Sequence, residues 1–218
     1  MKKYAIITAA GSGSRMGNSV PKQFIVIGKW PILMHTIQKF ASEVDEIILT
    51  LPKEYIPMWN DLVKQYHFQV PHQVVVGGSN RFQSVKNAVL TLPDSVLVAV
   101  HDGVRPFVSS ALIRQCFVAA EKNGNAVACV SVVESLRQKV NDTTISVDRS
   151  NFLSVQTPQV FKSDILKHAY LTAENDQFTD DASIVESAGE NIYCVEGENT
   201  NVKITYPEDL QLAERRLE

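Results

Sequence analysis

The 218-residue sequence contains only three cysteines, Cys116, Cys129 and Cys194, and they lie far apart along the chain. None has a second cysteine or a histidine at metal-ligand spacing, so we expect reduced core thiols in a cytoplasmic protein. No apolar run is long enough to cross a membrane, and an apolar strand pattern begins at Tyr4, so we expect no signal peptide. A net charge of −3 leaves no basic excess for nucleic acid. We therefore expect neither a membrane nor a nucleic-acid partner.

Several common catalytic signatures are also missing. The chain has no nucleophile elbow, no H-E-x-x-H helix and no paired-carboxylate motif. The glycine-rich stretch after the first apolar run is not a Walker loop, because Asn18 follows Gly17 where lysine is required. It also departs from the dinucleotide-binding fingerprint, because Met16 occupies the third glycine position and no acidic residue follows at the right distance. These departures count against an NAD-dependent oxidoreductase.

Apolar runs alternate with segments of helical period along the chain. This alternation predicts an α/β protein with a Rossmann-like, mostly parallel sheet and helices on both faces. The length predicts a single domain over residues 1–218. Ligands of such sheets bind at the carboxyl ends of the strands, so functional residues should follow strands. The predicted strands are 4–8, 46–51, 73–76, 96–100, 126–132 and 192–195, and the predicted helices are 31–41, 54–66, 80–91, 109–122, 163–174, 179–188 and 207–217.

Residues 9–23 form a loop suited to polyphosphate. Small residues and three glycines follow the first predicted strand, so backbone N–H groups can converge on phosphate oxygens without side-chain obstruction. Arg15 and Lys22 add two cations to the same stretch. An ordinary solvent-exposed turn has no need of these cations, so we favour phosphate binding over that alternative.

A second glycine-containing loop, residues 77–84, follows the predicted strand 73–76. Ser79 or Asn80 can cap the next helix, which would account for the segment without any ligand. Arg81, however, falls in the first helical turn, where the helix dipole disfavours a positive charge. Arg81 therefore answers an anion or another partner.

A helix is also expected to begin at Thr179, which is a natural cap. The two acids that follow, Asp180 and Asp181, favour the helix dipole at this end.

An acidic residue, Asp102, comes directly after the predicted strand 96–100. A carboxylate at this edge of the sheet, beside the phosphate loop, is placed to hold Mg²⁺ near a triphosphate. A purely structural ion pair between Asp102 and Arg105 is the alternative interpretation.

The pattern changes at about residues 132–155, where polar residues alternate around a turn at Asn141-Asp142-Thr143. This segment predicts a β-hairpin that leaves the core, although an exposed surface hairpin would look the same. Farther on, Lys203 interrupts an apolar run at 202–205 that we interpret as a strand. A lysine inside such a strand is uncommon without an anion to meet, so we place Lys203 beside the reaction.

Taken together, these motifs resemble those of the sugar-phosphate nucleotidyltransferases. Residues 9–17 and 21–24 are similar to the signature A-A-G-x-G-x-R-[ML]-x…P-K-Q, in the version of the cytidylyltransferases that act on methylerythritol phosphate. The later segments G-G-S-N-R-F-Q-S, H-D-G-V-R-P, V-D-R, Q-T-P-Q, T-D-D-A-S and N-V-K-I-T extend the resemblance over nearly the whole chain. It implies that the protein joins CTP to 2-C-methyl-D-erythritol 4-phosphate with Mg²⁺ or another divalent cation, releasing pyrophosphate.

The resemblance also implies a homodimer, in which the 132–155 hairpin is an arm exchanged between subunits and Arg149 reaches the partner's sugar phosphate. The arm usually carries D-T where this chain has Glu134-Ser135, and Ser135 keeps the hydroxyl. Some members carry an acidic metal-side residue where Asn199 and Thr200 stand here, which leaves Asp102 as the expected metal ligand. The implied residues are Arg15, Lys22 and Lys203 for catalysis; Ala9, Ala10, Gly11, Gly13, Gly78, Ser79, Arg81, Ser84 and Asp102 for the nucleotide; and Arg105, Ser135, Arg149, Thr157 and Thr179 for the sugar phosphate.

The implied reaction agrees with the missing catalytic motifs. A phosphate monoester has a second pKa of about 6, so the nucleophile is already an anion at neutral pH and needs no general base. The chain must instead bring two polyanions together, which cations and Mg²⁺ accomplish. A ribitol-phosphate cytidylyltransferase is the nearest alternative, and T-D-D-A-S with V-D-R favours methylerythritol phosphate. A non-catalytic nucleotide sensor would not need the full set of charged residues.

Overall fold

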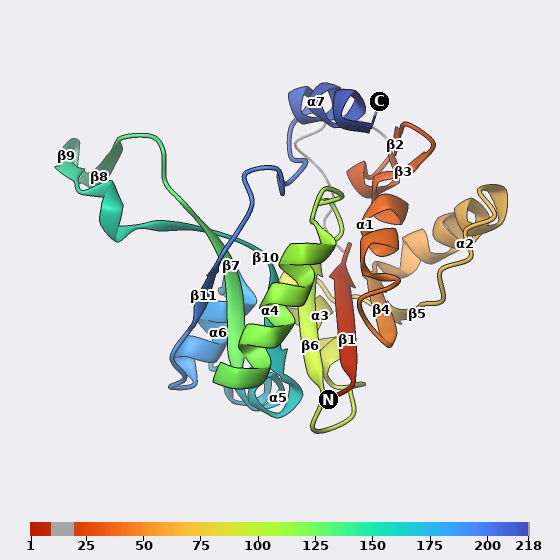
Figure 1. The fold of residues 1–218 in the computed structure, drawn as a ribbon, viewed down its shortest axis with the longest axis horizontal. Helices are drawn as coiled ribbons and strands as arrows, with labels where there is room; N and C mark the ends of the chain where they lie inside the picture. Colours follow the sequence, from red (N-terminus) through yellow and green to blue (C-terminus); the bar gives the residue numbers. More distant parts are fainter. Residues whose placement is uncertain (10–19, 218) are drawn as a thin grey trace.

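A seven-stranded sheet forms the frame of the protein, which is described here from a computed structural model covering residues 1–9 and 20–217. The strands lie in the order β11-β7-β10-β6-β1-β4-β5 (Figure 1). Strand β1 pairs in parallel with both β6 and β4, and parallel pairing also joins β4 to β5 and β7 to β11. The mostly parallel α/β sheet predicted from the sequence is thus confirmed. The strands are β1 Lys3–Thr8, β4 Glu46–Leu51, β5 Gln73–Val76, β6 Leu97–Asp102, β7 Asn125–Ser131, β10 Leu153–Lys162 and β11 Cys194–Glu196.

Strand β10 is the exception, because it runs antiparallel to both β6 and β7. The sequence pattern did not predict this strand. Its middle reads Gln156-Thr157-Pro158-Gln159, which has neither an apolar run nor a simple alternation, and the pairing with β7 is irregular between Val155 and Gln159. Proline is disfavoured inside a sheet because it cannot donate a ladder hydrogen bond. Buried polar side chains at this point are instead part of the site described below.

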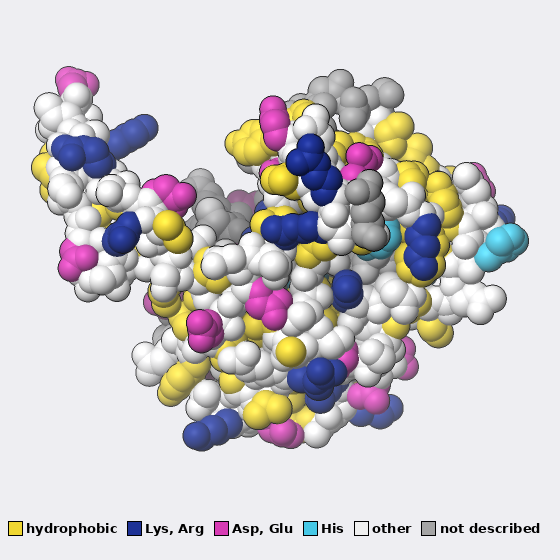
Figure 2. All heavy atoms as spheres, turned by 45° about the horizontal axis from the view of Figure 1, so that its top comes forward, with side chains coloured by type: hydrophobic (Ala, Val, Ile, Leu, Met, Phe, Trp, Pro, Cys, Tyr) yellow, Lys and Arg dark blue, Asp and Glu magenta, His cyan; other side chains and the backbone are white. Residues whose placement is uncertain are grey.

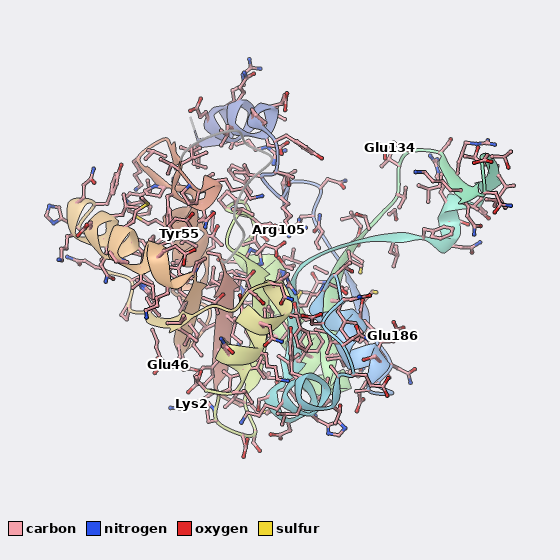
Figure 3. The ribbon with its side chains drawn as sticks, turned by 180° about the vertical axis from the view of Figure 1, so that it is seen from behind. Lys2, Glu46, Tyr55, Arg105, Glu134 and Glu186 are labelled. Atoms are coloured by element: carbon pink, nitrogen blue, oxygen red, sulfur yellow. The ribbon has the colours of Figure 1, made fainter. Side chains whose placement is uncertain are left out.

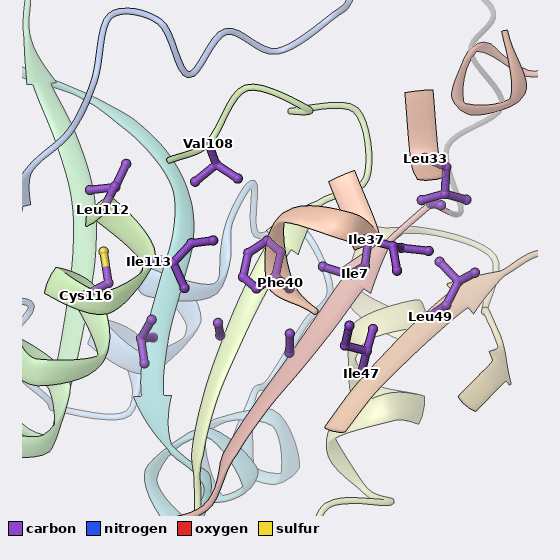
Figure 4. Packing of buried hydrophobic residues seen from close by; sticks show 14 of the residues in the cluster. Ile7, Leu33, Ile37, Phe40, Ile47, Leu49, Val108, Leu112, Ile113 and Cys116 are labelled. Carbon is purple, nitrogen blue, oxygen red and sulfur yellow. The ribbon is translucent and has the colours of Figure 1, made fainter. Parts of the chain in front are cut away.

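Both faces of the sheet are covered by helices. Strand β1 illustrates why, since Ala5 and Ile7 belong to one apolar cluster, Ile6 to another, and all three are fully buried. Such unbroken apolar runs are typical of central parallel strands. Figure 4 shows the first face, where Phe40, Ile37 and Ile113 lie against the strands. The helices on this face are α1 Ile32–Phe40, α2 Ile56–Gln65 and α4 Ser110–Asn123, and those on the other are α3 Arg81–Val89, α5 Ser163–Thr172 and α6 Asp181–Ser187.

A third, smaller cluster closes the upper edge of the sheet in Figure 1. It joins α7, Pro207–Leu217, to a short hairpin of β2, Val26–Ile27, and β3, Trp30–Pro31. Gly28 makes the turn of this hairpin with a φ of 56°, a conformation that glycine adopts without strain. The 3₁₀ helices are η2 Lys22–Phe24, η3 Lys53–Tyr55 and η4 Arg149–Asn151.

A separate two-stranded hairpin stands away from the body (Figure 1). It consists of β8, Leu136–Val140, and β9, Thr143–Val147, and it turns at Asn141, whose φ is 51°. The turn lies where the sequence placed it. Figure 2 shows Lys and Arg side chains gathered on this projection. Arg137 and Lys139, both in β8, are exposed. Whether the hairpin is exchanged between subunits stays a prediction.

None of the helices within residues 1–9 and 20–217 is both long and apolar enough to cross a bilayer.

Candidate active site

Asp102 is the centre of the candidate site. It is the last residue of β6, it pairs in register with Thr8 at the end of β1, and only 7% of it is exposed. Three cations surround its carboxylate. Lys203 Nζ lies 3.0 Å and Arg105 Nε 3.2 Å from Oδ2, while Arg81 Nε lies 3.8 Å from Oδ1. The position is the carboxyl edge of the sheet, as predicted from the sequence.

The surrounding cations decide the charge of Asp102. Burial alone would raise the pKa of this carboxyl, but the attraction of Arg81, Lys203 and Arg105 outweighs burial. The pKa of Asp102 is therefore held well below its usual range. Asp102 is thus ionised at neutral pH.

Arg81 has a second acidic partner, Asp181, in addition to Asp102. Its Nη2 donates to Oδ2 of Asp181 at 2.6 Å, and the Tyr170 hydroxyl donates to Oδ1 of the same carboxylate at 2.6 Å. Burial disfavours the charged guanidinium, but Asp181 and Asp102 together raise the pKa of Arg81. Asp181 is fully buried, and sequence reasoning treated it only as a helix-start acid. Its spacing from Ile184 and Val185 on the apolar side of α6 was the signal that could have revealed it.

Of two helix caps predicted from the sequence, one is confirmed and one is wrong. Asn80, one of the two candidates, caps α3 by accepting the Gln83 backbone N–H at 2.9 Å. The prediction that Thr179 caps the next acidic helix was wrong, because α6 is capped by Asp180, which accepts the Ser183 N–H at 3.1 Å. Thr179 is thereby left to line a cavity.

Lys203 lies beside Asp102, but not within a strand. The chain at 202–205 has no regular structure, and the prediction of a strand there was wrong. This segment is held instead by single contacts, such as Ile204 N–H to Val104 O at 2.9 Å, so it lacks the continuous partner that a strand requires. The Lys203 side chain is 44% exposed, so it contacts the Asp102 carboxylate without being buried.

Two cavities meet at this charge cluster. The first, of about 340 Å³, and the second, of about 320 Å³, share Arg81, Asp102 and Lys203 in their walls. The structure therefore places one anion and two cations between two separate spaces. The first cavity is also lined by Thr8, Ala9, Lys22, Gln23, Ser79, Asn80, Ser84 and Val104, and the second by Arg105, Val155, Gln156, Thr157, Gln159, Thr179, Asp180 and Ser183.

The wall of the first cavity is tied together by local hydrogen bonds. Lys22 Nζ donates to Ile204 O at 3.0 Å, so Lys22 lies against the segment that carries Lys203. The Ser84 hydroxyl accepts the Gly78 N–H at 3.0 Å and donates to Asn80 O at 2.7 Å. A Cβ on Gly78 would lie 2.3 Å from Gln83 Cβ, so only glycine fits this loop.

The wall of the second cavity is joined directly to Asp102. The Thr157 hydroxyl accepts the backbone N–H of Asp102 at 3.1 Å, and Arg105 Nη1 donates to Asn201 O at 2.8 Å. Gln156 and Gln159 are further polar residues here that the sequence did not single out. Gln156 donates to Glu198 O at 2.9 Å, and Gln159 donates to Asp180 at 2.9 Å.

The remaining predicted residues that the structure describes do not line these cavities. Ser135 and Arg149 are exposed and line neither cavity, and the Arg149 guanidinium donates to Val133 O. Figure 3 shows Glu134 on the connection to the hairpin, far from Arg105 in the body. Ala10, Gly11, Gly13 and Arg15 lie outside the described residues.

The residues present suit a hard divalent cation held jointly with phosphate. Among residues 1–9 and 20–217, no group of three His, Cys, Asp or Glu side chains could hold a metal ion alone. Mg²⁺ commonly binds through one or two carboxylates and completes its octahedron with phosphate oxygens and waters. Asp102 Oδ1, whose ion-pair contact to Arg81 is a long 3.8 Å, is the available ligand.

Comparisons with known proteins agree with this geometry. A family profile described as "IspD: 2-C-methyl-D-erythritol 4-phosphate cytidylyltransferase" matches residues 4–218. A cytidylyltransferase of that name from Porphyromonas gingivalis is 46% identical over 213 residues, covering 97% of this chain and 96% of the relative. One from Bacillus thuringiensis is 39% identical and covers 96% and 95%.

Solved structures of proteins from the same family also match this chain. The 2-C-methyl-D-erythritol 4-phosphate cytidylyltransferase of Thermus thermophilus matches with a TM-score of 0.84 and 32% identity, over 99% of this chain and 98% of that one. The 4-diphosphocytidyl-2C-methyl-D-erythritol synthase of Anaerococcus prevotii also matches with a TM-score of 0.84, at 29% identity and the same coverage. The chain belongs to the IspD family, the 2-C-methyl-D-erythritol 4-phosphate cytidylyltransferases.

Proposed function

We propose that the protein transfers the cytidylyl group of CTP to 2-C-methyl-D-erythritol 4-phosphate and releases pyrophosphate. The observation that carries this proposal is the pair of cavities separated by Arg81, Asp102 and Lys203. A reaction between two anionic substrates requires two adjoining binding spaces with positive charge at their junction. The ribitol-phosphate alternative would use the same frame, but family membership does not favour it.

The first cavity is assigned to CTP and the second to the sugar phosphate. Lys22, together with Arg15 of the preceding loop, would neutralise the α-phosphate and the departing pyrophosphate. A phosphate oxygen of the sugar attacks the α-phosphorus of CTP, a new P–O bond forms, and the bond to the pyrophosphate oxygen breaks. Lys203, at the junction of the cavities, would stabilise the charge that develops during this in-line transfer.

The proposed reaction uses a divalent cation. Asp102 would hold this ion, and the ion would offset the negative charge of the triphosphate. The Thr157 hydroxyl fixes the Asp102 backbone from the side of the second cavity, so the metal ligand and the wall of the sugar-phosphate site are positioned together.

We also propose that the protein acts as a homodimer through residues 132–155. The β8–β9 hairpin has few contacts with its own body, and Val133, Ile145, Phe152 and Leu153 expose 45–69% of their surface. Apolar side chains on a projecting element are typical of a surface that a partner covers. Ser135 and Arg149 would then contribute to the second cavity of the partner subunit.

Pyrophosphate release tests the reaction. Purified protein is incubated with CTP and Mg²⁺, in parallel with 2-C-methyl-D-erythritol 4-phosphate or ribitol 5-phosphate, and pyrophosphate is measured over time. We expect release only with the former. Release only with ribitol 5-phosphate would show that the protein is a ribitol-phosphate cytidylyltransferase. Release with neither substrate would contradict the proposed activity.

A further inference from the structure

Two of the three cysteines, which the sequence suggested were isolated, lie in contact. Cys129 Sγ lies 3.2 Å from Cys194 Sγ, although 65 residues separate them along the chain. They belong to neighbouring parallel strands, in which Cys194 is paired with Val127 and Glu196 with Cys129. Residues two apart in a strand share a face, so the two thiols are diagonal neighbours on the same face of the sheet.

The two thiols differ in their surroundings. Cys129 is buried, whereas Cys194, contrary to the expectation of a core thiol, is exposed on the edge strand β11. Both line an open cavity of about 390 Å³, together with Glu196 and Gly197. A small oxidant can therefore reach Cys194 from solvent, and Cys129 lies beside it in the same cavity wall.

We propose that Cys129 and Cys194 are a redox-modifiable pair that closes to an intramolecular disulfide joining β7 to β11. This inference goes beyond the cytidylyltransferase reaction and does not depend on it. The third cysteine, Cys116, belongs to the apolar cluster on the opposite face of the sheet and takes no part.

The chemistry requires a low-molecular-weight disulfide such as glutathione disulfide. The Cys194 thiolate attacks one sulfur of the oxidant, forms a mixed disulfide and releases one glutathione. The Cys129 thiolate then attacks Cys194 Sγ and releases the second glutathione. In total, the two protein thiols lose two protons and two electrons, and the oxidant becomes two molecules of glutathione.

The order of attack follows from burial. Burial, with added contributions from Cys194 and Asp180, raises the pKa of Cys129 to about 12. Thiolate is the attacking form, so the buried Cys129 acts second, when the nearby mixed disulfide compensates for its low thiolate population. The exposed Cys194 is the point of entry.

The disulfide would restrain a segment that leads to the charge cluster. Gly197 N–H donates to Cys129 O at 2.7 Å, and Asn201 then donates to Thr157 O at 2.7 Å, two residues before Lys203. Strand β11 has only three residues and one neighbour, so it is weakly held without the crosslink. Oxidation would fasten the start of this segment to the interior of the sheet.

Peptide mapping tests the pair directly. The full-length protein is oxidised with glutathione disulfide, its free thiols are alkylated after denaturation, and it is digested with trypsin. The sequence places each cysteine in a different tryptic peptide: 115–122, 123–137 and 168–203. We expect peptides 123–137 and 168–203 to be linked, with Cys116 alkylated. Glutathione retained on 168–203 beside an alkylated 123–137, or three alkylated cysteines, would overturn the proposal.

Thermal unfolding provides a second readout and a matched control. A disulfide closing a loop of this length raises the unfolding temperature by about 5–15 °C in a domain of this size. We expect this rise in the oxidised protein and its reversal by dithiothreitol. Cys194→Ser changes an exposed side chain and should not show the rise. An equal rise in that variant would show that another modification is responsible.

Discussion

Asp102 and the cations around it are the residues on which the proposed chemistry depends. Each cation comes from a different part of the chain: Arg81 from α3, Arg105 from the turn after β6, and Lys203 from the C-terminal segment. Because one buried carboxylate holds all three, its substitution would disturb several groups at once. Substitutions of single cations are therefore more informative than substitution of Asp102.

Lys22 is the first single-residue test. Its amino group contacts the segment that carries Lys203, and Lys22 lines the first cavity, which we assign to CTP, so Lys22→Ala removes a charge from that cavity only. We expect kcat to fall on the order of 10²-fold or more, as when one transition-state donor is removed. Steady-state pyrophosphate release measures this. An unchanged kcat would exclude Lys22 from the transition state.

The Arg81–Asp181 pair gives a prediction for a positioning residue. Asp181→Asn keeps the shape but removes the charge that orients Arg81, so we expect kcat/KM to fall by about 10-fold or more. Tyr170→Phe is the matched variant, since it removes one hydrogen bond and leaves the charge. We expect a smaller loss there. Equal losses in the two variants would indicate that packing, rather than the orientation of Arg81, is being measured.

His101 makes stability depend on pH. Burial lowers the pKa of His101 from 6.5 to about 4, and its Nε2 interacts with Arg105 O at 3.2 Å. Between these values the unfolded chain binds a proton that the folded protein does not, so stability falls as pH decreases. From pH 7.5 to 5 the loss from this group is about 2 kcal/mol.

Denaturant unfolding at both pH values measures that loss. His101→Gln should reduce the difference between them, whereas His168→Gln, which replaces an exposed histidine, should leave it unchanged. If His101→Gln keeps the full pH dependence, the responsible group lies elsewhere.

The β8–β9 hairpin and strand β10 are the elements that separate this molecule from a simple parallel sheet. Arg149 lies in η4, just after the hairpin, and no residue of β8 or β9 lines either cavity of its own chain. Strand β10 leads from the hairpin into the sheet and delivers Thr157 to Asp102. Together they would connect a second subunit to the reacting groups.

Mixing two inactive variants tests the arm. Lys22→Ala inactivates the body of its own chain, and Arg149→Ala inactivates the arm. If the arm acts across the dimer, each mixed dimer has one site built from two intact parts. Random reassociation then restores about a quarter of wild-type activity. If Arg149 serves its own chain, no intact site forms and mixing restores none.

Sequence reasoning succeeded for elements with a strong period and failed where tertiary contacts decided. The parallel strands and the helices around them follow from apolar runs such as that of β1. The carboxylate and cations after strands were also identified, because a charge beside a buried run is conspicuous. Strand β10 escaped because its middle is polar, and Lys203 was misplaced because its neighbours are apolar without being a strand. The contacts of Asp181 and Cys194 depend on partners about 100 and 65 residues away in sequence.

The whole molecule presents a preformed site rather than one built around a metal. Asp102 is already neutralised by three cations, and each side of the sheet has a buried apolar cluster of its own. A divalent cation is thus assigned to the chemistry and not to folding. The stability of the protein and its activity should respond differently to metal removal.

A chelator separates the two. With excess EDTA we expect pyrophosphate release to disappear and the unfolding temperature to change by less than about 2 °C, because residues 1–9 and 20–217 contain no cluster of three His, Cys, Asp or Glu side chains that could hold a structural ion. Activity should return with Mg²⁺. A large drop in unfolding temperature would reveal a structural ion, and full activity in EDTA would remove the cation from the mechanism.

The antiparallel strand β10 also has a consequence for the order in which the chain can assemble during synthesis. Strands β5, β4, β1 and β6 all lie within residues 1–102 and can pair as soon as they emerge from the ribosome. Strand β7 is made next, but its place in the sheet is beyond β10, so it must wait until residue 162 has been added. The seam between β6 and β10 is where Asp102 meets Thr157. The nascent protein therefore acquires most walls of the first cavity early, whereas Lys203, which lines both cavities, is added only near the end of translation.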